Sequence, residues 1–147
     1  MIKYFLLSVL AALLAACGTT IGAAPAPRAA AAKPGAATVE VAYLNHSPVR
    51  PILAEVDQLL AKYGDRVSVT RYDFDTPEGD AFAKAKGLTE HTPLAIFVNG
   101  SMEFTLDGRA VKFYSFPKGQ GNFMVPDGGW TIEDLQRVLD EATSKPS

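Results

Sequence analysis

The sequence predicts an α/β domain in which strands and helices alternate around a central mixed sheet. Short β-rich segments at 39–44 and 67–74 are each followed by a proline and then by apolar residues at helical spacing. The segment 93–98 is almost wholly apolar, as expected for a central strand covered on both faces. Asn99-Gly100 follows it directly and indicates a tight turn. The expected element order is β-α-β-α-β-β-α.

The first two helices are predicted from their end signals. We expect the first to begin at Pro48, with Ser47 as its N-cap, and to end at Gly64. Its apolar face is expected to contain Ile52, Leu53, Val56, Leu59, Leu60 and Tyr63. The second helix is expected to begin at Pro77, with Thr76 as its N-cap, and to end near Gly87.

The last third of the domain holds two more expected strands, a loop and a helix. The segment 102–106 is expected to form a strand antiparallel to 93–98, and 111–116 can form a third strand that reverses direction again. A loop is expected at 117–129. Thr131 and Asp134 have the spacing of a capping box, which indicates the start of the final helix.

Aromatic residues are concentrated around this loop. The group consists of Phe113, Tyr114, Phe116, Phe123 and Trp130. Such residues more often fold an inserted segment onto the edge of a sheet than form an exposed binding surface. We therefore predict that they pack in the core.

An export signal is predicted at residues 1–16. It has one basic residue, Lys3, and then an uncharged run that is too short to span a membrane well. Leu-Ala-Ala-Cys at 14–17 resembles the lipobox of bacterial lipoprotein precursors. The resemblance implies that cleavage precedes Cys17 and that its thiol carries a diacylglyceryl group, with acyl chains such as palmitate. Glycine at position 18, directly after the cysteine, resembles the pattern of lipoproteins that are sorted to the outer membrane. An ordinary secretory signal with an incidental cysteine is the alternative.

The signal divides the chain into three expected regions and indicates where in the cell the folded domain lies. Residues 17–37 form the lipidated cysteine and an Ala/Pro-rich tether, which reaches roughly 60–70 Å when fully stretched. Residues 38–147 form the folded domain. Removing the signal leaves 13 basic residues (14 less Lys3) against 16 acidic, a net charge of −3. This charge does not predict nucleic-acid binding. Membrane attachment would rest on the acyl chains, with the domain in the periplasm and the anchor in the outer membrane.

Cysteine usage limits the chemistry of the mature protein. Cys17 is the only cysteine in the chain. A lipidated chain would therefore have no thiol for a disulfide, a metal–thiolate site or a nucleophile. The export compartment permits disulfides, but the sequence predicts none.

The element order and two segments resemble the thioredoxin fold. The segment 92–100, Thr-Pro-Leu-Ala-Ile-Phe-Val-Asn-Gly, is similar to the cis-proline strand of that family and the turn after it. The segment 45–50, Asn-His-Ser-Pro-Val-Arg, lies where the family places its redox motif. The resemblance covers 38–107 and 130–143. It implies a thioredoxin-like sandwich with a β/loop insertion at 109–129, before the last helix.

The redox motif itself is absent. His46 and Val49 occupy the two cysteine positions, with Ser47 and Pro48 between them. Thiol–disulfide exchange requires a thiolate that attacks a sulfur, and neither residue can supply one. The domain is therefore not expected to be a thiol oxidoreductase.

Peptide binding is the family property that does not need sulfur. In the family, the loop before the cis-proline pairs its backbone with an extended substrate segment. Here that loop would be 90–93, with His91, Thr92 and Pro93, and the resemblance implies that it faces 45–48. A cis X–Pro bond costs only about 0.5–1 kcal/mol, so this shape does not require cysteines. We expect a redox-inactive, noncatalytic module that binds an envelope protein or peptide. The alternative is that Pro93 only shapes the fold.

Two alternatives use the two histidines of the chain. His46 and His91 would lie at the same edge of the sheet and could share a zinc or copper ion, with Glu90 or Asp73 as oxygen ligands. His46 could instead act as a general base with Glu40 in a hydrolytic site. The sequence contains no nucleophile signature or phosphate-binding loop. No enzyme class and no resident cofactor are therefore predicted.

Overall fold

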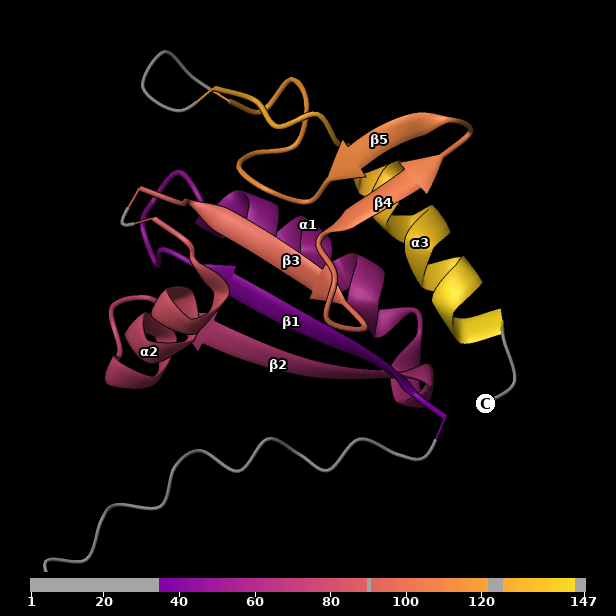
Figure 1. The fold of residues 1–147 in the computed structure, drawn as a ribbon, viewed down its shortest axis with the longest axis horizontal. Coiled ribbons are helices and arrows are strands. Elements are labelled where there is room, and N and C mark those ends of the chain that lie inside the picture. Colours follow the sequence, from indigo (N-terminus) through magenta and orange to yellow (C-terminus); the bar gives the residue numbers. More distant parts are fainter. Residues whose placement is uncertain (1–34, 90, 122–125, 145–147) are drawn as a thin grey trace, which may run out of the picture.

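The computed structural model describes residues 35–89, 91–121 and 126–144. The elements are β1 (Ala37–Tyr43), α1 (Arg50–Ala61), a 3-10 turn (Gly64–Arg66), β2 (Val67–Asp73), α2 (Pro77–Lys86), β3 (Leu94–Val98), β4 (Glu103–Leu106), β5 (Arg109–Lys112) and α3 (Ile132–Ser144). Figure 1 shows their arrangement. The predicted signal, Cys17 and the tether up to residue 34 lie outside the described residues, as do Glu90 and Phe123.

The central sheet has three strands in the order β2-β1-β3. β1 is parallel to β2, with Val39 opposite Val69, and antiparallel to β3, with Val41 opposite Ile96. The sheet is therefore mixed, and the predicted mixed α/β class is confirmed. A second sheet consists of the antiparallel pair β4 and β5.

The expected strand at 111–116 is divided between two partners. Its first residues belong to β5, which begins at Arg109 and pairs with β4. The residues that follow turn toward β3, where Tyr114 forms an antiparallel bridge with Ala95. The amide of Ile96 donates to the carbonyl of Phe113 over 3.0 Å, and this bond fixes the change of partner.

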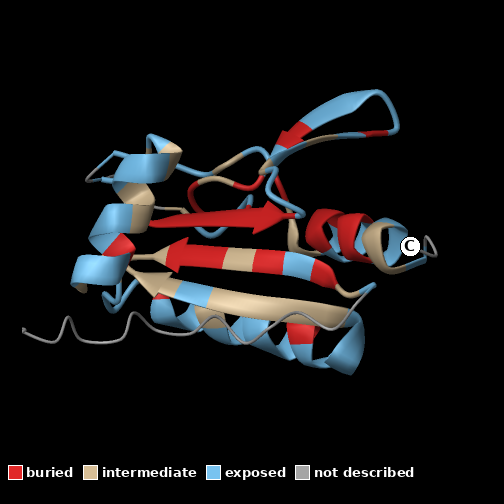
Figure 2. Ribbon diagram, turned by 60° about the horizontal axis from the view of Figure 1, so that its bottom comes forward, coloured by how far each residue is buried: buried red, intermediate tan, exposed pale blue. Residues whose placement is uncertain are grey.

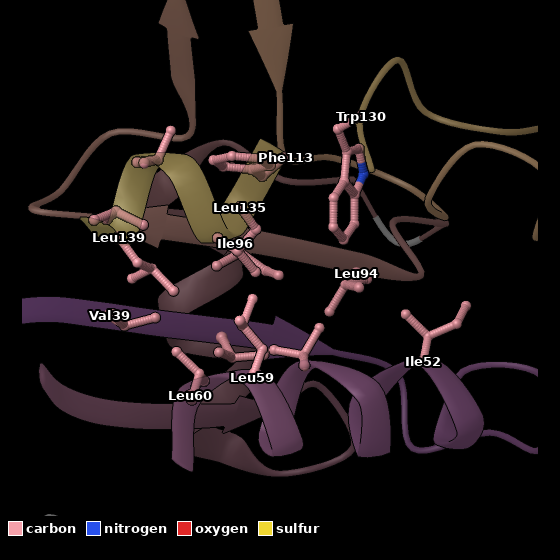
Figure 3. Packing of buried hydrophobic residues seen from close by; sticks show 14 of the residues in the cluster. Val39, Ile52, Leu59, Leu60, Leu94, Ile96, Phe113, Trp130, Leu135 and Leu139 are labelled. Atoms are coloured by element: carbon pink, nitrogen blue, oxygen red, sulfur yellow. The ribbon is translucent and has the colours of Figure 1, made fainter. Parts of the chain in front are cut away.

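The helices cover the central sheet from both sides. α1 and α3 pack on one face, and α2 crosses the other face near the carboxyl ends of β1 and β2 (Figures 1 and 2). All five residues of β3 are buried, as the sequence predicted, but β3 is an edge strand of the three-stranded sheet and β1 is the central one. The core between the sheet and the α1/α3 layer includes Val39, Ile96, Leu59, Leu135 and Leu139 (Figure 3). Each such side chain contributes about 1.5–3 kcal/mol by leaving water.

The aromatic residues around the expected loop extend this core. Phe113 and Trp130 are fully buried and Phe116 is 2% exposed. The rings of Phe113 and Trp130 meet edge to face with centroids 5.5 Å apart. The prediction of core packing is confirmed for these three residues.

Two of the three helices begin where the sequence predicted. Thr76 caps α2, and its Oγ1 accepts the amide of Gly79 over 3.1 Å. Gly87 ends that helix in the left-handed conformation, with φ +67°. At the start of α3, Thr131 and Asp134 exchange side chain-to-amide bonds of 2.9 and 3.2 Å. These end signals are local, which is why the sequence alone could identify them.

The start of α1 differs from the prediction. The helix begins at Arg50 with Val49 as its N-cap, so Ser47 and Pro48 lie in the preceding turn. Pro51 explains the shift, because proline has no amide proton and fits only the first turn of a helix. A helix that started at Pro48 would place Pro51 where an amide donor is required. α1 also ends at Ala61, before Gly64.

α2 approaches the sheet unusually closely at Gly79. This glycine is buried, and a Cβ atom there would lie 1.8 Å from the carbonyl oxygen of Asp73. Only glycine fits that contact. Farther along the helix, Phe82 stacks on Tyr72 of β2, with centroids 3.8 Å apart. The close contact fixes α2 beside the carboxyl end of β2.

Candidate functional site

The residues at the redox-motif positions lie in the turn between β1 and α1. His46, Ser47 and Pro48 are exposed, whereas Val49 is 2% exposed and packs in the core. The His46 side chain is 60% exposed, and its Nε2 lies 3.8 Å from a carboxylate oxygen of Asp75. The turn therefore presents one imidazole to solvent and uses Val49 for packing.

A hydrogen-bond network next to this turn was not predicted. Asn45 Nδ2 donates to Asp73 over 3.0 Å, and Arg50 donates to the side-chain and main-chain oxygens of Asn45 over 3.3 Å. Asp73 also accepts the amide of Asp75 over 3.0 Å. Burial raises the pKa of the neighbouring Tyr43, and the Asp73 carboxylate adds to that rise. Asp73 thus organises the local turn.

The Pro93 loop differs from the family pattern. The described residues contain no cis peptide bond, so Thr92–Pro93 is trans and the predicted cis-proline is wrong. The trans form is favoured by about 0.5–1 kcal/mol unless the surroundings select cis. Here the surroundings fit the trans loop. The Thr92 amide donates to the carbonyl of Thr89 over 3.0 Å, and the Pro93 carbonyl accepts the Leu44 amide over 3.0 Å. The Thr92 amide is thus already used within the loop.

Thr92 links this loop to the segment after β5. It is fully buried, and its hydroxyl lies 3.0 Å from the hydroxyl of Tyr114 and 3.3 Å from that of Thr89. The three hydroxyls form a chain from one side of the loop to the other. We call Thr89 and residues 91–93, with this chain of hydroxyls, the ridge.

A cavity of about 600 Å³ lies on the α2 side of the ridge. It is lined by Leu44, Phe74, Asp80, Ala83, Lys84, Leu88, Thr89 and His91. Four of these side chains are apolar, and Asp80 and Lys84 pair with each other over 2.7 Å. We call it the helix cavity.

A second cavity of about 420 Å³ lies on the other side of the ridge. It is lined by His91, Pro93, Lys112, Tyr114, Ser115, Pro126, Asp127, Gly128 and Gly129. Lys112 pairs with Glu103 over 2.8 Å, and Asp127 accepts the amides of Gly119 and Gly121. We call it the loop cavity.

The wall of the loop cavity has a constrained backbone. Ser115 has φ +64°, a left-handed conformation that side chains with a Cβ rarely adopt. It is held there because its amide donates to Leu94 and its hydroxyl to Pro126, both over 2.9 Å. A Cβ atom on the adjacent Gly128 would lie 2.2 Å from the carbonyl oxygen of Tyr114. The Trp130 indole donates to the Tyr114 and Ser115 carbonyls over 3.2 and 3.3 Å. The wall is therefore fixed by buried groups.

The two cavities meet at His91, which lines both. Pro93 lines the loop cavity, whereas His46 lines neither. The sequence therefore identified two residues of the site but missed its walls. Leu44, Phe74 and Leu88 lie just after β1, β2 and α2 respectively, and no local pattern marks them as neighbours.

The histidine-based alternatives gain no support from the described residues. Within 35–89, 91–121 and 126–144, no three His, Cys, Asp or Glu side chains come together as a metal site. Glu40, which the sequence offered as a partner for His46, instead pairs with Lys86 over 2.9 Å. The metal and hydrolytic sites stay predictions.

Comparison with known protein families and with curated proteins finds no match to this chain. No helix in the described part of the chain has the length and apolar character needed to cross a membrane. Every buried side-chain nitrogen or oxygen among the described residues has a hydrogen-bond partner.

Proposed function

We propose that this protein is a noncatalytic module that binds a protein segment in the bacterial envelope. The observation that carries this proposal is the pair of largely apolar cavities that meet at His91, with volumes of about 600 and 420 Å³. Open, apolar cavities with a few polar groups are typical of binding sites. Because Ser115 and Trp130 hold the wall of the loop cavity in place, a ligand need not order that wall on binding.

The fold we propose is thioredoxin-like without redox chemistry. Its support is the order β1-α1-β2-α2-β3 and the position of β1 between a parallel and an antiparallel neighbour. The isolated antiparallel bridge between Tyr114 and Ala95 lies at the outer edge of β3, where a fourth strand of that fold would pair. The absence of any cysteine other than Cys17 supports a binding role over a redox role.

We further propose that lipidated Cys17 anchors the domain to the outer membrane, facing the periplasm. The lipobox-like segment 14–17 and Gly18 support this location. Labelled palmitate should be incorporated by the wild-type precursor and lost in Cys17→Ser. Equal labelling of the two precursors would contradict the anchor and leave the binding site unaffected.

The binding function can be tested with an unfolded polypeptide as the probe. We would use the mature chain with Cys17→Ser and a reduced, carboxymethylated protein that cannot refold. Ala83→Glu places a charged side chain in the helix cavity. Ala81→Glu is the matched control, because Ala81 is exposed on the same helix and lines neither cavity.

We expect the parent chain and Ala81→Glu to bind the probe equally, and Ala83→Glu to bind it at least about tenfold more weakly. Tenfold is the effect of losing one apolar contact of ordinary strength. Equal binding by all three chains, or no binding by the parent chain, would contradict the proposal.

A further inference from the structure

We infer that β2 pairs with the β2 strand of a second copy of this chain, antiparallel and about a two-fold axis at Thr70. β2 is an outer strand of the central sheet, and no described element lies beyond it (Figure 1). The inference goes beyond the proposed function, because no residue of β2 lines either cavity.

The two margins of the central sheet differ. On the outer side of β3, the Ile96 amide donates to the Phe113 carbonyl over 3.0 Å, and the Ser115 amide donates to the Leu94 carbonyl over 2.9 Å. The outer side of β2 has no such cover within the described residues. Its seven residues include no proline, glycine or lysine, and its register with β1 runs without a bulge. An edge without these protective features is a template for another strand.

Alternate residues of β2 direct their main-chain groups away from β1. The Phe74 amide donates to the Tyr43 carbonyl of β1 over 2.9 Å, so the even-numbered residues before Phe74 face β1 in the same way. Val69 and Arg71 therefore direct their amides and carbonyls outward. No described residue forms a hydrogen bond with these four groups.

The outward groups at the two ends of β2 are partly used within the chain. The Val67 amide donates to the Gly64 carbonyl, and the Asp73 carbonyl accepts the Thr76 amide over 3.0 Å. Among the described residues, the Val67 carbonyl and the Asp73 amide have no partner. One end of the edge thus offers an acceptor, and the other end offers a donor.

An antiparallel pair centred on Thr70 satisfies all of these free groups. Val69 lies opposite Arg71 of the second copy, and directly opposite residues whose groups face each other exchange both bonds. Val67 lies opposite Asp73 of the second copy, so the free amide meets the free carbonyl and the two used groups meet each other. A shift of the centre by one residue leaves free groups unpaired. An unrelated extended strand would place surplus groups opposite the used ones. This match favours a second copy as the partner.

The side chains of β2 are compatible with this register. Arg71 forms an ion pair with Asp57 of α1, so its charge is balanced within its own chain. On the other face of β2, Thr70 lies opposite Thr70 of the second copy, a cross-strand pair that stabilises sheets. α2 lies at the carboxyl end of β2 and leaves the middle of the strand open (Figure 2).

The tether allows both copies to share one membrane. β1 begins at Ala37, beside Val67, so the two-fold axis places the two starts roughly 25 Å apart at 3.3 Å per residue and 4.8 Å per strand. Residues 18–34 reach roughly 55–60 Å when fully stretched. With Cys17 anchored as proposed, two copies would meet at a high local concentration.

The chain's own N-terminal segment is the other strand that could reach this edge. Residues 18–34 contain Pro25, Pro27 and Pro34. Proline has no amide to donate to a strand partner. The segment is therefore a poorer match for β2 than a second β2.

The test uses the mature chain with Cys17→Ser, so it does not depend on the lipid. Sedimentation equilibrium from micromolar to millimolar protein should show a monomer–dimer equilibrium. Hydrogen exchange followed by NMR should show that the Val69 and Arg71 amides become protected as the dimer forms.

A charge exchange at Thr70 tests the register. Thr70→Lys or Thr70→Glu alone places like charges opposite each other, so each should raise the dissociation constant of the dimer at least about fivefold. An equimolar mixture of the two variants should associate as tightly as the parent chain. Thr105→Lys, at an exposed position of β4, is the matched control and should dimerise like the parent.

A second pair of variants tests the main-chain bonds. Arg71→Pro removes an outward amide and leaves the pairing with β1 in place. Arg71→Ala removes only the side chain. We expect Arg71→Pro to stay monomeric over the whole concentration range and Arg71→Ala to dimerise. A far-UV circular dichroism spectrum like that of the parent checks that each variant is folded.

Three results would overturn the inference. The first is a parent chain that is monomeric at every concentration. The second is a monomer whose Val69 and Arg71 amides are already protected, which would assign the edge to the chain's own residues. The third is a dimer that the Thr70 variants and Arg71→Pro leave unchanged, which would place the interface elsewhere. None of these readouts uses a ligand, so their failure is distinct from a failure to bind the unfolded polypeptide.

Discussion

The turn at 45–49 and the ridge, formed by Thr89 and residues 91–93, are neighbours, but they have different surroundings. They are joined by the hydrogen bond from the Leu44 amide to the Pro93 carbonyl, 3.0 Å long. The turn projects His46, Ser47 and Pro48 into solvent, and only Val49 is buried. In the ridge, Thr92 is fully buried and is held by hydroxyls on both sides.

This difference separates the proposed binding site from the turn. The turn carries the positions at which a thioredoxin would place its cysteines, yet none of its residues lines a cavity with His91. The ridge needs no sulfur to keep its shape, because hydrogen bonds and the packed segment after β5 support it. The following predictions test this contrast, from the largest expected effect to the smallest.

Gly128→Ala should be the most damaging single change in the wall of the site. The added Cβ would lie 2.2 Å from the Tyr114 carbonyl oxygen and 2.8 Å from Trp130 Cδ1. We expect a loss of about 3 kcal/mol or more in the free energy of unfolding, as for other severely overpacked positions. Gly129→Ala is the control and should change it by less than about 0.5 kcal/mol. Urea denaturation measures both. Similar midpoints for the two variants would contradict the close contact.

Val49→Ala tests how much the buried residue of the turn contributes to stability. Val49 is 2% exposed and belongs to the core. Removing its two methyl groups leaves a cavity, so we expect a loss of about 2 kcal/mol. Pro48→Ala, at an exposed position, should cost much less. If Pro48→Ala were the more damaging change, the placement of Val49 at the start of α1 would be wrong.

Thr92→Val should weaken the ridge by a smaller amount. The substitution keeps the shape of the side chain but removes the hydroxyl between Tyr114 and Thr89, which lie 3.0 and 3.3 Å away. We expect a loss of about 1 kcal/mol, because two part-buried hydrogen bonds of the Thr92 hydroxyl are removed. Ser47→Ala in the exposed turn should be neutral within about 0.5 kcal/mol. Equal losses of stability for Thr92→Val and Ser47→Ala in thermal melts would contradict the difference between the ridge and the turn.

The two histidines should differ in binding and not in stability. Both are exposed, so His46→Ala and His91→Ala should each change the free energy of unfolding by less than about 0.5 kcal/mol. His91 lines both cavities, so His91→Ala should lower the affinity for the unfolded polypeptide several-fold. His46→Ala should bind like the parent chain. Weaker binding by His46→Ala together with unchanged binding by His91→Ala would place the binding site at the turn.

Local signals explain how much of the fold could be predicted. The caps at Thr76 and Gly87 and the capping box at Thr131 are formed by residues within one turn of each other, and all three were found from the sequence. The start of α1 was missed because two prolines compete for the first turn. Pro51 lies in the first turn of α1. A helix that began at Pro48 would need an amide proton at position 51, and proline has none.

The candidate site could be predicted only in part. His91 and Pro93 were found through their place before the apolar strand. The trans bond at Pro93 was not, because it depends on hydrogen bonds to Thr89 and Leu44 that form only in the folded chain. The left-handed Ser115 was also missed, because serine carries no signal for that conformation.

The most direct test of the ridge as the binding site is a two-dimensional ¹H–¹⁵N NMR titration of the labelled mature Cys17→Ser chain with the unlabelled unfolded polypeptide. We predict that the largest amide shifts occur at Ala83, Leu88, His91 and Gly129, on both sides of the ridge. The amides of His46 and Ser47, and those of Glu55 and Gln136 on the α1/α3 side, should move little. Shifts concentrated at His46 and Ser47 or between α1 and α3, with none at His91, would contradict the account.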